Sequence, residues 1–480
     1  MGLTLSLLAL PALGAIATAL ATRRRPALAM VVTTATLVAG LVHARAILTD
    51  GAVTVVVGTD RLAAVLAADG LAIGLVVLSS AVLLAATGFA TAQRATMGPP
   101  LASFWPLSLV LLTGLHGLFL AGDLFTAYLM LEVVAVAGAV LVAFGGGHAR
   151  LVAGTRYFYA ELVASVTFLV GTALVWSVAG TVVIAELPGQ LTGSTTGRVA
   201  LALLTVGLLL KVPVVPLHFW LPAAHTLAPS AVSPLLSALV VKSAFVVLLR
   251  LWITGAPELT ATAVAPLVGA LGAVAILWGG VSALRATPVK VVVAYSTVAQ
   301  LGLLLLAVPM VVDGSAEAWV GGVVHAIAHA LPKAALLMAV AVLAHQLGGD
   351  SVDHLAGAAT RRPIAAFPIG IAAVSLIGLP PTGGFVAKWY LVVASISTGQ
   401  WWWAATIVVG SLLTAAYLAR LLQRSFAAVP SDAASPRPRG RAPDVIALTL
   451  ASAGLLLGLY PNGLLRLLEV GAPLGGVAHG

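Results

Sequence analysis

Long apolar runs follow one another along almost the whole of this 480-residue chain. Hydrophobic residues make up 61% of it and charged residues 8%, against about 25% charged in a soluble domain. No soluble core could enclose so much apolar surface, so the runs predict transmembrane segments of about 20 residues each. Backbone groups in lipid must be satisfied within their own segment, which favours helices. A β-barrel would instead show short segments of alternating polarity.

We therefore expect an all-α polytopic membrane protein of about fourteen transmembrane helices, forming a single membrane domain over residues 1–480. The helices are expected at 2–21, 27–48, 66–92, 101–121, 123–145, 155–179, 197–221, 230–254, 260–283, 290–310, 317–346, 363–396, 400–426 and 445–467. Within the domain, helices one to three occupy 1–92, a first repeat 101–254, a second repeat 260–426 and the last helix 445–467.

The loop charges test this helix count, because excess Lys and Arg mark cytoplasmic loops. If the loops alternate, one side receives Arg23, Arg24, Arg25, Arg94, Arg150, Arg156, Arg285, Lys290, Arg361, Arg362, Arg420, Arg424, Arg437, Arg439 and Arg441. The other side receives only Arg45, Arg61, Arg198, Arg250 and Arg466, with the acids Asp50, Asp60, Glu186, Glu258, Asp313 and Glu317. This asymmetry predicts that both termini lie outside the cell.

Two of the expected helices contain breaks. The first break is in KVPVVPLHFWLP, beginning at Lys211, and the second is in GLPPTGGFVAK, ending at Lys388. Proline removes a backbone donor and clashes with the preceding turn, and such breaks occur at membrane depth where they line an enclosed or wet cavity. The breaks are five helices apart, which predicts two five-helix repeats of opposite orientation, the inverted repeat of many transporters.

Four of the five lysines, Lys211, Lys242, Lys333 and Lys388, lie within apolar runs, whereas Lys290 has the position of an ordinary flanking lysine. Each charge at bilayer depth costs about 2.5–3.5 kcal/mol on insertion scales. Together with a buried acid they indicate a path for charge through the membrane.

Glu132 lies near the middle of the fifth expected helix. We interpret it as the counter-charge of a lysine on a neighbouring helix, since a pair about 8 Å apart attracts by about 2 kcal/mol at an effective dielectric constant of about 20. The alternative is a neutral, hydrogen-bonded core carboxyl. For Lys211 the alternative is a side chain that reaches to the interface. Glu161 is expected to be paired near a helix end.

His325, His329 and Lys333 are spaced i, i+4, i+8 and so share one helix face. Histidine exchanges protons near neutral pH, which favours a proton relay. Chelation of a metal by the two histidines is the rival interpretation, but no third ligand is available on that helix. His218 and His225 flank the first break as possible accessory groups on the cytoplasmic side.

Sequence motifs for cofactor chemistry are not found in this chain. It lacks cysteine, and it contains no Walker A, dinucleotide-binding or HExxH motif. We therefore expect no cofactor and no metal, and energy that comes from an ion gradient or from a partner.

Several motifs resemble the antiporter-like membrane subunits shared by respiratory complex I, membrane-bound hydrogenases and Mrp-type cation/proton antiporters. They are KVPVVPLHFWLPAAHTLAPSAVSPLLSALVVK, VKVVVAYSTVAQLG, HAIAHALPKAALL and GLPPTGGFVAKW, and the resemblance covers about 60–425. The segment GLHGLFLAGDLFTAYLMLEV is most similar to the D-type subunits of Mrp antiporters. The resemblance also implies fourteen helices and a paired five-helix inverted repeat.

The resemblance assigns roles by position. It implies that Glu132 and Lys211 form the glutamate–lysine pair of the half-channel that takes protons in, and that Lys242 is the bridging lysine. His325, His329 and Lys333 match the central hydrophilic axis, and Lys388 matches the last residue of the half-channel that lets protons out.

Three functional hypotheses follow. The first is a proton-translocating subunit of a multi-subunit Na⁺/H⁺ antiporter, a secondary transporter rather than an enzyme, in a bacterial or archaeal cell membrane. The second is a proton-pumping module of complex I or a membrane-bound hydrogenase, in which a redox reaction elsewhere supplies the energy. The third is a scaffold whose polar residues only stabilise helix packing. In the first two, the expected partners are other membrane subunits, protons, the lipid bilayer and, for an antiporter, Na⁺.

Overall fold

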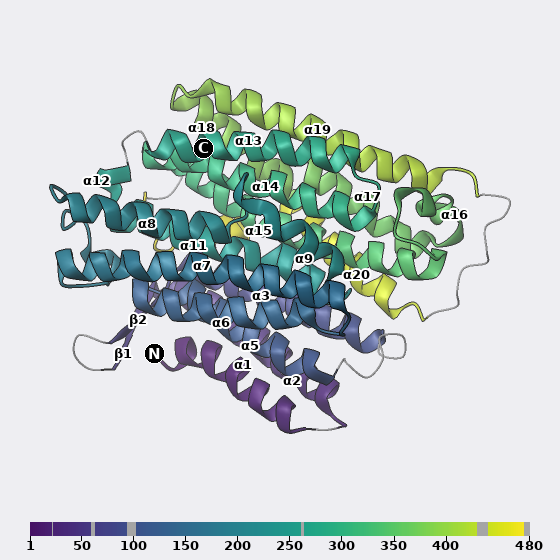
Figure 1. Cartoon of the computed structure of the whole chain (residues 1–480), viewed down its shortest axis with the longest axis horizontal. Helices are drawn as coiled ribbons and strands as arrows, with labels where there is room; N and C mark the ends of the chain where they lie inside the picture. The colour runs from purple at the N-terminus through teal and green to yellow at the C-terminus, as the bar shows by residue number, and fades with distance from the viewer. Residues whose placement is uncertain (22, 59–62, 94–101, 261–263, 430–439, 475–480) are drawn as a thin grey trace.

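The computed structural model describes the chain except residues 22, 59–62, 94–101, 261–263, 430–439 and 475–480. It is a bundle of roughly aligned helices (Figure 1). Eleven of the described helices are long and apolar enough to cross a membrane. They are α1 (Gly2–Leu20), α2 (Arg25–Asp50), α3 (Gly70–Ala92), α6 (Leu124–Ala143), α7 (His148–Ala179), the continuous segment Ser233–Gly255, α13 (Val264–Arg285), α14 (Val289–Val312), α15 (Ala316–Leu347), α19 (Trp401–Phe426) and α20 (Ala442–Leu459).

The other expected spans are α5 (Phe104–Leu120) and the two broken helices. The first consists of α8 (Thr195–Lys211), the 3₁₀ turn η4 (Leu217–Trp220) and α9 (Leu221–Leu227). The second consists of α17 (Pro363–Ile377) and α18 (Gly383–Ser397). Every one of the fourteen expected positions therefore carries a described helix, and both predicted breaks are confirmed.

The segment Ser233–Gly255 is irregular along its length. It contains α10 (Ser233–Leu235), the π-helical turn η5 (Leu236–Val240), α11 (Val241–Arg250) and a second π-helical turn, η6 (Leu251–Gly255). The remaining short helices are η3 (Ile184–Glu186), α12 (Pro257–Thr260), η7 (Val352–Leu355), α16 (Ala358–Arg361) and α21 (Asn462–Glu469).

Two of the expected helices contain structure that the sequence does not predict. An antiparallel hairpin of β1 (Val53–Val57) and β2 (Ala64–Ala68) precedes α3 and includes the first residues, 66–68, of the helix expected at 66–92; in it Val53 pairs with Ala68. The hairpin forms because VTVVV is β-branched at every position. The helix expected at 445–467 is divided into α20 and α21, since Pro461 cannot donate the next helical hydrogen bond.

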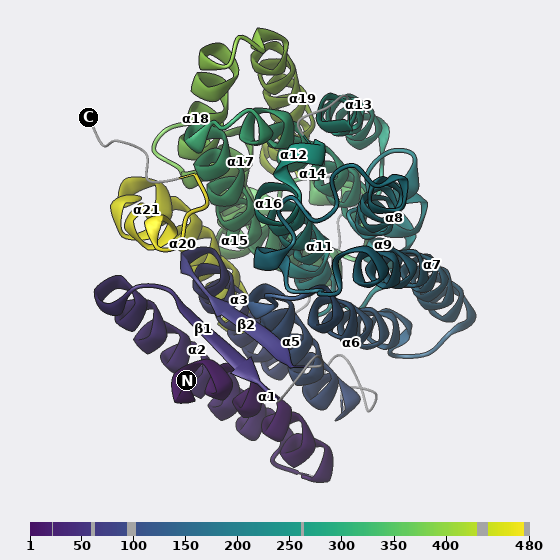
Figure 2. The same cartoon turned by 90° about the vertical axis from the view of Figure 1, so that its left-hand side faces the viewer.

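The hairpin, the start of α1 and α21 lie at one end of the bundle (Figure 2), whereas α16 lies at the other (Figure 1). The helices alternate in direction, so the described residues of the basic loop set gather at the α16 end, as the charge count predicts. Asp60, Arg61, Arg94, Arg437 and Arg439 of that count lie outside the described residues.

The two repeats pack in the same order. In the first, α5, α6, α7 and α8 pack each against the next, and α5 also contacts α11. In the second, α13, α14 and α15 pack in sequence, α15 contacts both α17 and α18, and α13 contacts α19. Because a unit of five helices is odd in number, α5 and α13 begin at opposite ends of the bundle, as an inverted repeat requires.

The helix α15 forms the centre of the molecule. It contacts α3, α14, α17, α18, α20 and the π-helical turn η5. All residues of its most apolar stretch are buried inside the protein, although the helix contains Pro332. Charged or titratable groups on this helix are therefore enclosed by protein rather than by lipid.

The C-terminal segment fastens the beginning of α3. The Gly70 amide donates to the carbonyl of Val470 at 2.8 Å. A Cβ atom at Gly70 would lie 1.7 Å from the Leu467 carbonyl oxygen, so only glycine permits this close approach. Next to it, Arg250 Nη2 donates to Asp69 Oδ1 at 2.8 Å, and the same oxygen caps α3 at the Ala72 amide.

Replacing Gly70 with alanine is expected to displace α21 and lower stability by about 1–3 kcal/mol, because the obstructing atom is backbone and cannot rotate away. Gly370→Ala is the matched control, since nothing lies within 4 Å of a Cβ there. The measurement is the temperature at which the detergent-purified protein loses its monodisperse elution profile. Equal midpoints for the two variants would contradict the close approach.

Candidate functional site: a buried axis of lysines and histidines

Lys211 forms a buried ion pair across two helices of the first repeat. Its Nζ atom lies 2.7 Å from Glu161 Oε2, and the two side chains are only 3% and 5% exposed. Lys211 is the last residue of α8, immediately before the break, and Glu161 lies on α7. The lysine therefore turns into the protein and does not extend to the interface. Removing one partner of such a pair leaves an uncompensated charge at high cost.

The residue in direct contact with Lys211 is therefore Glu161, and the pairing of Glu132 with a lysine about 8 Å away stays a prediction. Glu132 on α6 stands close enough for its charge to act on Glu161, but its Oε1 atom is buried without a hydrogen-bond partner among the described groups. The structure thus brings two carboxyls and one amine together. Glu161 forms the ion pair with Lys211, and the charge of Glu132 acts on Glu161.

Glu161 was expected to be paired near a helix end; it is paired, but it lies well inside its helix, for a simple geometric reason. Starting the helix at residue 155 puts Glu161 near its end, whereas α7 begins at His148. At 1.5 Å per residue, thirteen residues place Glu161 about 20 Å along the helix, well into the bundle. A helix start at His148 was signalled by Gly145, Gly146 and Gly147, all of which have positive φ.

Lys242 lies at the beginning of α11, directly after the π-helical turn η5, and is 1% exposed. Its Nζ atom donates to the Ala238 carbonyl at 2.8 Å. A π-turn changes which carbonyls the backbone amides reach, and such turns are frequent at functional sites. Nearby, the hydroxyls of Ser237 and Thr297 are 2.9 Å apart and join η5 to α14.

Lys333 is completely buried at the middle of α15. Its Nζ atom donates to the Val293 carbonyl at 3.1 Å and, in a shorter contact, to the Ser296 hydroxyl. Both acceptors lie on α14, so oxygen atoms of a neighbouring helix replace the water that the amine has lost. Sequence reasoning missed Ser296, because a single serine in an apolar helix is common.

His325 and His329 stack along α15, with ring centroids 5.7 Å apart and planes inclined by 24°. Both are 3% exposed, and neither nitrogen of His325 has a partner with hydrogen-bond geometry among the described groups. The charges of Lys242, Lys333 and Lys388 all act on His329. The structure therefore brings the predicted central groups together around one pair of imidazoles.

The side chain of Lys388 reaches across the second break, from α18 to the end of α17. It lies on α18, and its Nζ atom donates to Ile377 O at 2.8 Å, to Leu376 O at 3.3 Å and to Ser411 Oγ at 2.9 Å. The first two acceptors are terminal carbonyls of α17, which have no partner within their own helix. The negative end of the α17 dipole also favours a cation at this position. The break thus creates the lysine site.

His225 and Lys290 lie where the first broken helix approaches the basic end of the bundle. His225 is 1% exposed, its ring nitrogens have no described hydrogen-bond partner, and the charges of Lys333 and Lys290 act on it. Lys290 is half-buried and donates to Ala228 O at 3.1 Å, at the end of α9. It is therefore more than the ordinary flanking lysine expected. His218 lies on η4, with its ring against Tyr295 at 6.2 Å.

These groups form two clusters, although the helices α8 and α11 that carry Lys211 and Lys242 contact each other. Lys211, Glu161 and Glu132 make up the first cluster, and Lys242, the two histidines, Lys333 and Lys388 make up the second. Among the described residues, no hydrogen bond or ion pair links Lys211 to Lys242. The same part of the chain holds no group of three or more His, Asp or Glu side chains that could bind a metal ion.

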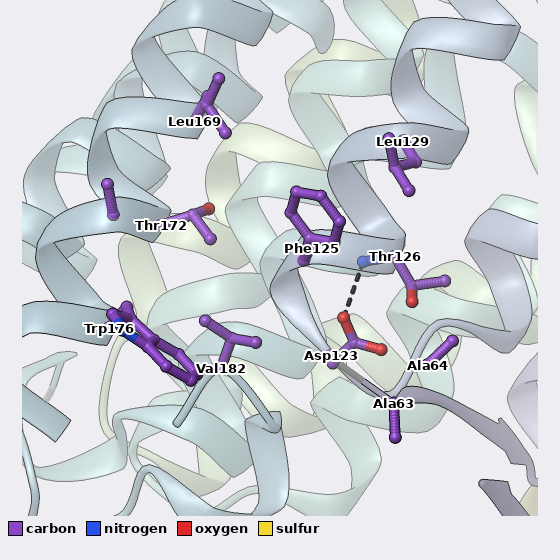
Figure 3. Close-up of a pocket in the computed structure, with 11 residues that line it drawn as sticks. Ala63, Ala64, Asp123, Phe125, Thr126, Leu129, Leu169, Thr172, Trp176 and Val182 are labelled. Atoms are coloured by element: carbon purple, nitrogen blue, oxygen red, sulfur yellow. Dashed lines mark hydrogen bonds between the residues drawn. The ribbon is translucent and has the colours of Figure 1, made fainter. Parts of the chain in front are cut away.

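A separate apolar cavity of about 390 Å³ lies between α6, α7 and the start of β2 (Figure 3). Phe125, Leu129 and Trp176 line it, and no lysine does. Asp123 borders it, but its carboxylate accepts from the Thr126 amide at 2.7 Å and from the Val65 amide at 2.8 Å. Asp123 thus caps α6, and the cavity is not part of the lysine axis.

Fold and buried charges together define a multi-pass helical membrane protein with ionisable groups at bilayer depth. Residues 121–414 match the protein family described as NADH:quinone oxidoreductase/Mrp antiporter, TM. The match covers more than half of the chain, and the chain belongs to this family.

Its relatives include components of redox complexes and of antiporters. The N-type subunit of the NADH-quinone oxidoreductase of Desulforudis audaxviator is 32% identical over 363 residues, which are 75% of this chain and 72% of that protein. The D-type subunit of the Na⁺/H⁺ antiporter of Bacillus subtilis is 27% identical over 365 residues, 75% of this chain and 70% of that protein.

The whole fold recurs in solved structures. A chain of the Mrp complex from Dietzia sp. DQ12-45-1b superposes with a TM-score of 0.89 at 25% identity, covering 98% of both chains. A chain of an archaeal membrane-bound sulfane sulfur reductase has the same fold, with a TM-score of 0.89 at 23% identity. Both structures are of membrane complexes.

A double-mutant cycle distinguishes the two possible partners of Lys211. Stability is measured for Lys211→Met, Glu161→Gln and the double variant, and again with Glu132→Gln in place of Glu161→Gln. Contacting residues couple by about 0.5–3 kcal/mol, so the Lys211–Glu161 cycle is expected to show coupling of that size and the Lys211–Glu132 cycle a smaller one. Thermal unfolding in detergent supplies the values. A larger coupling to Glu132 would reverse the assignment.

Proposed function

We propose that this chain is the proton-translocating subunit of a multi-subunit, Mrp-type Na⁺/H⁺ antiporter. It is a secondary transporter subunit, and protons move along its buried Lys, Glu and His side chains. The observation that carries the proposal is the convergence of three buried lysines, Lys242, Lys333 and Lys388, on the histidine pair. Ionisable groups inside a membrane protein mark ion paths and proton relays.

The proposed path begins at the first cluster. A proton that arrives at Glu132 or Glu161 neutralises a carboxyl beside Lys211 and so weakens the attraction on the amine, which passes a proton inward. Lys242 receives the proton, and the histidines and Lys333 carry it across the middle of the bundle. Lys388, beside the second break, delivers it to the exit. His218 and His225 are accessory groups near the basic end.

Repulsion between neighbouring cations drives the transfer. Two unit charges about 8 Å apart repel by about 2 kcal/mol at an effective dielectric constant of about 20. Arrival of a proton at one lysine therefore favours departure from the next. In a scaffold that only packs helices, several amines buried close together would lower stability without any benefit. This argues against a role in helix packing alone.

A second candidate function is supported by the 32% identity to a component of an NADH-quinone oxidoreductase. In this case the chain is a proton-pumping subunit of complex I or of a membrane-bound hydrogenase, and a redox reaction in partner subunits supplies the energy. The similarity to the D-type subunits of Na⁺/H⁺ antiporters supports the antiporter. Superposition alone does not separate the two functions, because chains of the Mrp complex and of the sulfane sulfur reductase superpose equally well.

We further propose that the protein resides in the plasma membrane of a bacterium or archaeon with both termini outside. The gathering of arginines at the α16 end supports this orientation. Its partners are other membrane subunits of the complex, and the ions are protons and Na⁺.

Lys211→Ala and Glu132→Ala are each expected to lower exchange by about 100-fold or to background without loss of assembly, because each removes a proton-transfer group. The measurement is Na⁺-driven dissipation of a pH gradient in vesicles that contain the complex with its natural partners. Arg198→Ala, at an exposed position, is the control. Full exchange in either variant would remove that residue from the path, and loss of assembly with normal transport per complex would favour a scaffold.

Purification of the chain with its natural partners separates the two candidate functions. Small cation-antiporter subunits among the co-purifying chains are expected. Iron–sulfur or hydrogenase subunits in their place would establish the redox-driven pump.

A further inference from the structure

Uncharged polar side chains on α14 and α19 lie between Lys333 and Lys388. These residues are Ser296 and Gln300 on α14, and Ser411, Thr414 and Tyr417 on α19. The two helices contact each other and lie in the same half of the molecule as α18 (Figure 2). Spacings of four on α14 and of three on α19 place the members of each set on one helix face. None of these residues is a histidine or carries a charge.

We propose that these hydroxyls form a second proton link between Lys333 and Lys388, parallel to the histidine pair. The inference rests on the proposed function, because it presupposes that protons pass between these two lysines. At one end, Lys333 donates to the hydroxyl of Ser296. At the other, Lys388 donates to the hydroxyl of Ser411 at 2.9 Å.

Tyr417 and Thr414 fill the space between the two ends. The Tyr417 hydroxyl lies among the side chains of Ser296, Gln300 and Thr414. Gln300 Nε2 lies 3.3 Å from the Thr414 hydroxyl, which holds the amide of α14 against α19. Ser296, Thr414 and Tyr417 are each 1% exposed, so neither bulk water nor lipid reaches them.

Ser411 and Thr414 border the same small cavity as Lys388 and Gln300. Its volume is about 10 Å³, at the lower limit for one water molecule. Gln300 Oε1 is buried without a hydrogen-bond partner among the described groups, which provides an acceptor for such a water. The cavity therefore provides room for a water molecule between Thr414 and Ser411.

The link is open in the described arrangement and closes by rotation of hydroxyl groups. Ser296 donates to Val293 O at 2.9 Å and Thr414 to Gly410 O at 2.8 Å, both within their own helices. The Tyr417 hydroxyl has no partner with hydrogen-bond geometry among the described groups and can turn toward either. Rotation of the Ser296, Tyr417 and Thr414 hydroxyls, together with one water in the cavity, is therefore enough to join the groups into a continuous chain.

The proton balance of the link is simple. Lys333 gives one proton to Ser296, each hydroxyl and the cavity water passes on a different proton, and the neutral amine of Lys388 accepts the last. Each hydroxyl ends with one proton, as it began, and one positive charge has moved from Lys333 to Lys388. No oxidant, reductant or metal takes part.

Tyr417→Phe tests the link with the least disturbance, because the hydroxyl that it removes makes no geometric hydrogen bond to a described group. Its thermal stability in detergent is expected to equal that of the wild type. Its rate of Na⁺-driven proton exchange in vesicles, with the natural partner subunits present, is expected to fall about fivefold, the worth of one net hydrogen bond. Ser425→Ala is the control, since that buried hydroxyl on the same helix donates to Leu421 O within the helix.

Thr414 provides a second, independent pair of variants. Thr414→Val keeps the shape of the side chain but removes the hydroxyl, and it is expected to lower the exchange rate about as much as Tyr417→Phe. Thr414→Ser restores the hydroxyl and is expected to recover most of the loss. Recovery by serine separates proton transfer from packing, because serine packs less well than valine at this position.

Removal of the histidines shows whether the link is parallel to them. In a His325→Ala/His329→Ala background, residual exchange is expected and Tyr417→Phe is expected to abolish it. Tyr417→Phe and Thr414→Val rates equal to that of Ser425→Ala in both backgrounds, with normal exchange in the wild type, would overturn the link alone. Absence of exchange in the wild-type complex would overturn the proposed function and the link with it.

Discussion

An ammonium group inside a helical bundle is stable only where oxygen atoms replace its hydration shell, and this requirement shapes the whole molecule. In the interior of a regular helix every carbonyl already accepts a backbone hydrogen bond. Each buried lysine therefore lies at an irregularity of its helix or against a neighbouring helix. Lys388 receives the terminal carbonyls of α17, because the chain breaks there. Lys242 follows a π-helical turn. Lys211 has a carboxylate, and Lys333 is served by α14.

The inverted repeat places these irregularities where they can cooperate. Both broken helices belong to corresponding positions of the two units, and α15 lies at the centre between them. Lys242 of the first unit and Lys333 and Lys388 of the second consequently meet near one buried helix, whereas Lys211 pairs with Glu161 in a cluster of its own. The packing that encloses α15 also excludes bulk water, which keeps the electrostatic interactions among the amines strong.

Much of the fold could be predicted from the sequence, because a span is defined by its length and apolar character alone. The fourteen positions and both breaks followed from run lengths and from prolines. The β-hairpin did not, since its strands are as apolar as a helix and are followed directly by α3. The division of the last span at Pro461 was also missed, although the same proline rule identified the other breaks.

The candidate site was predictable where residue type alone is unusual, as for a lysine in an apolar run. Direct pairing was not predictable, because it depends on depth along neighbouring helices. A seven-residue error at the start of α7 placed Glu161 near a helix end, although it lies well into the bundle and contacts Lys211. Hydroxyl residues such as Ser296 and Tyr417 carry no such signal, because serine and tyrosine occur in apolar helices for many reasons.

The enclosure of α15 has a consequence for how such a protein changes access from one side of the membrane to the other. Transporters with inverted repeats commonly rock one bundle against another around a fixed site. Here α15 contacts η5 of the first unit, its neighbours in the second unit, and both α3 and α20. A rocking motion of one unit against the other would therefore have to break many of its packing contacts. In the proposed function, access to the two sides would then alternate through side-chain rotation and brief entry of water into narrow passages, with the helical framework in place.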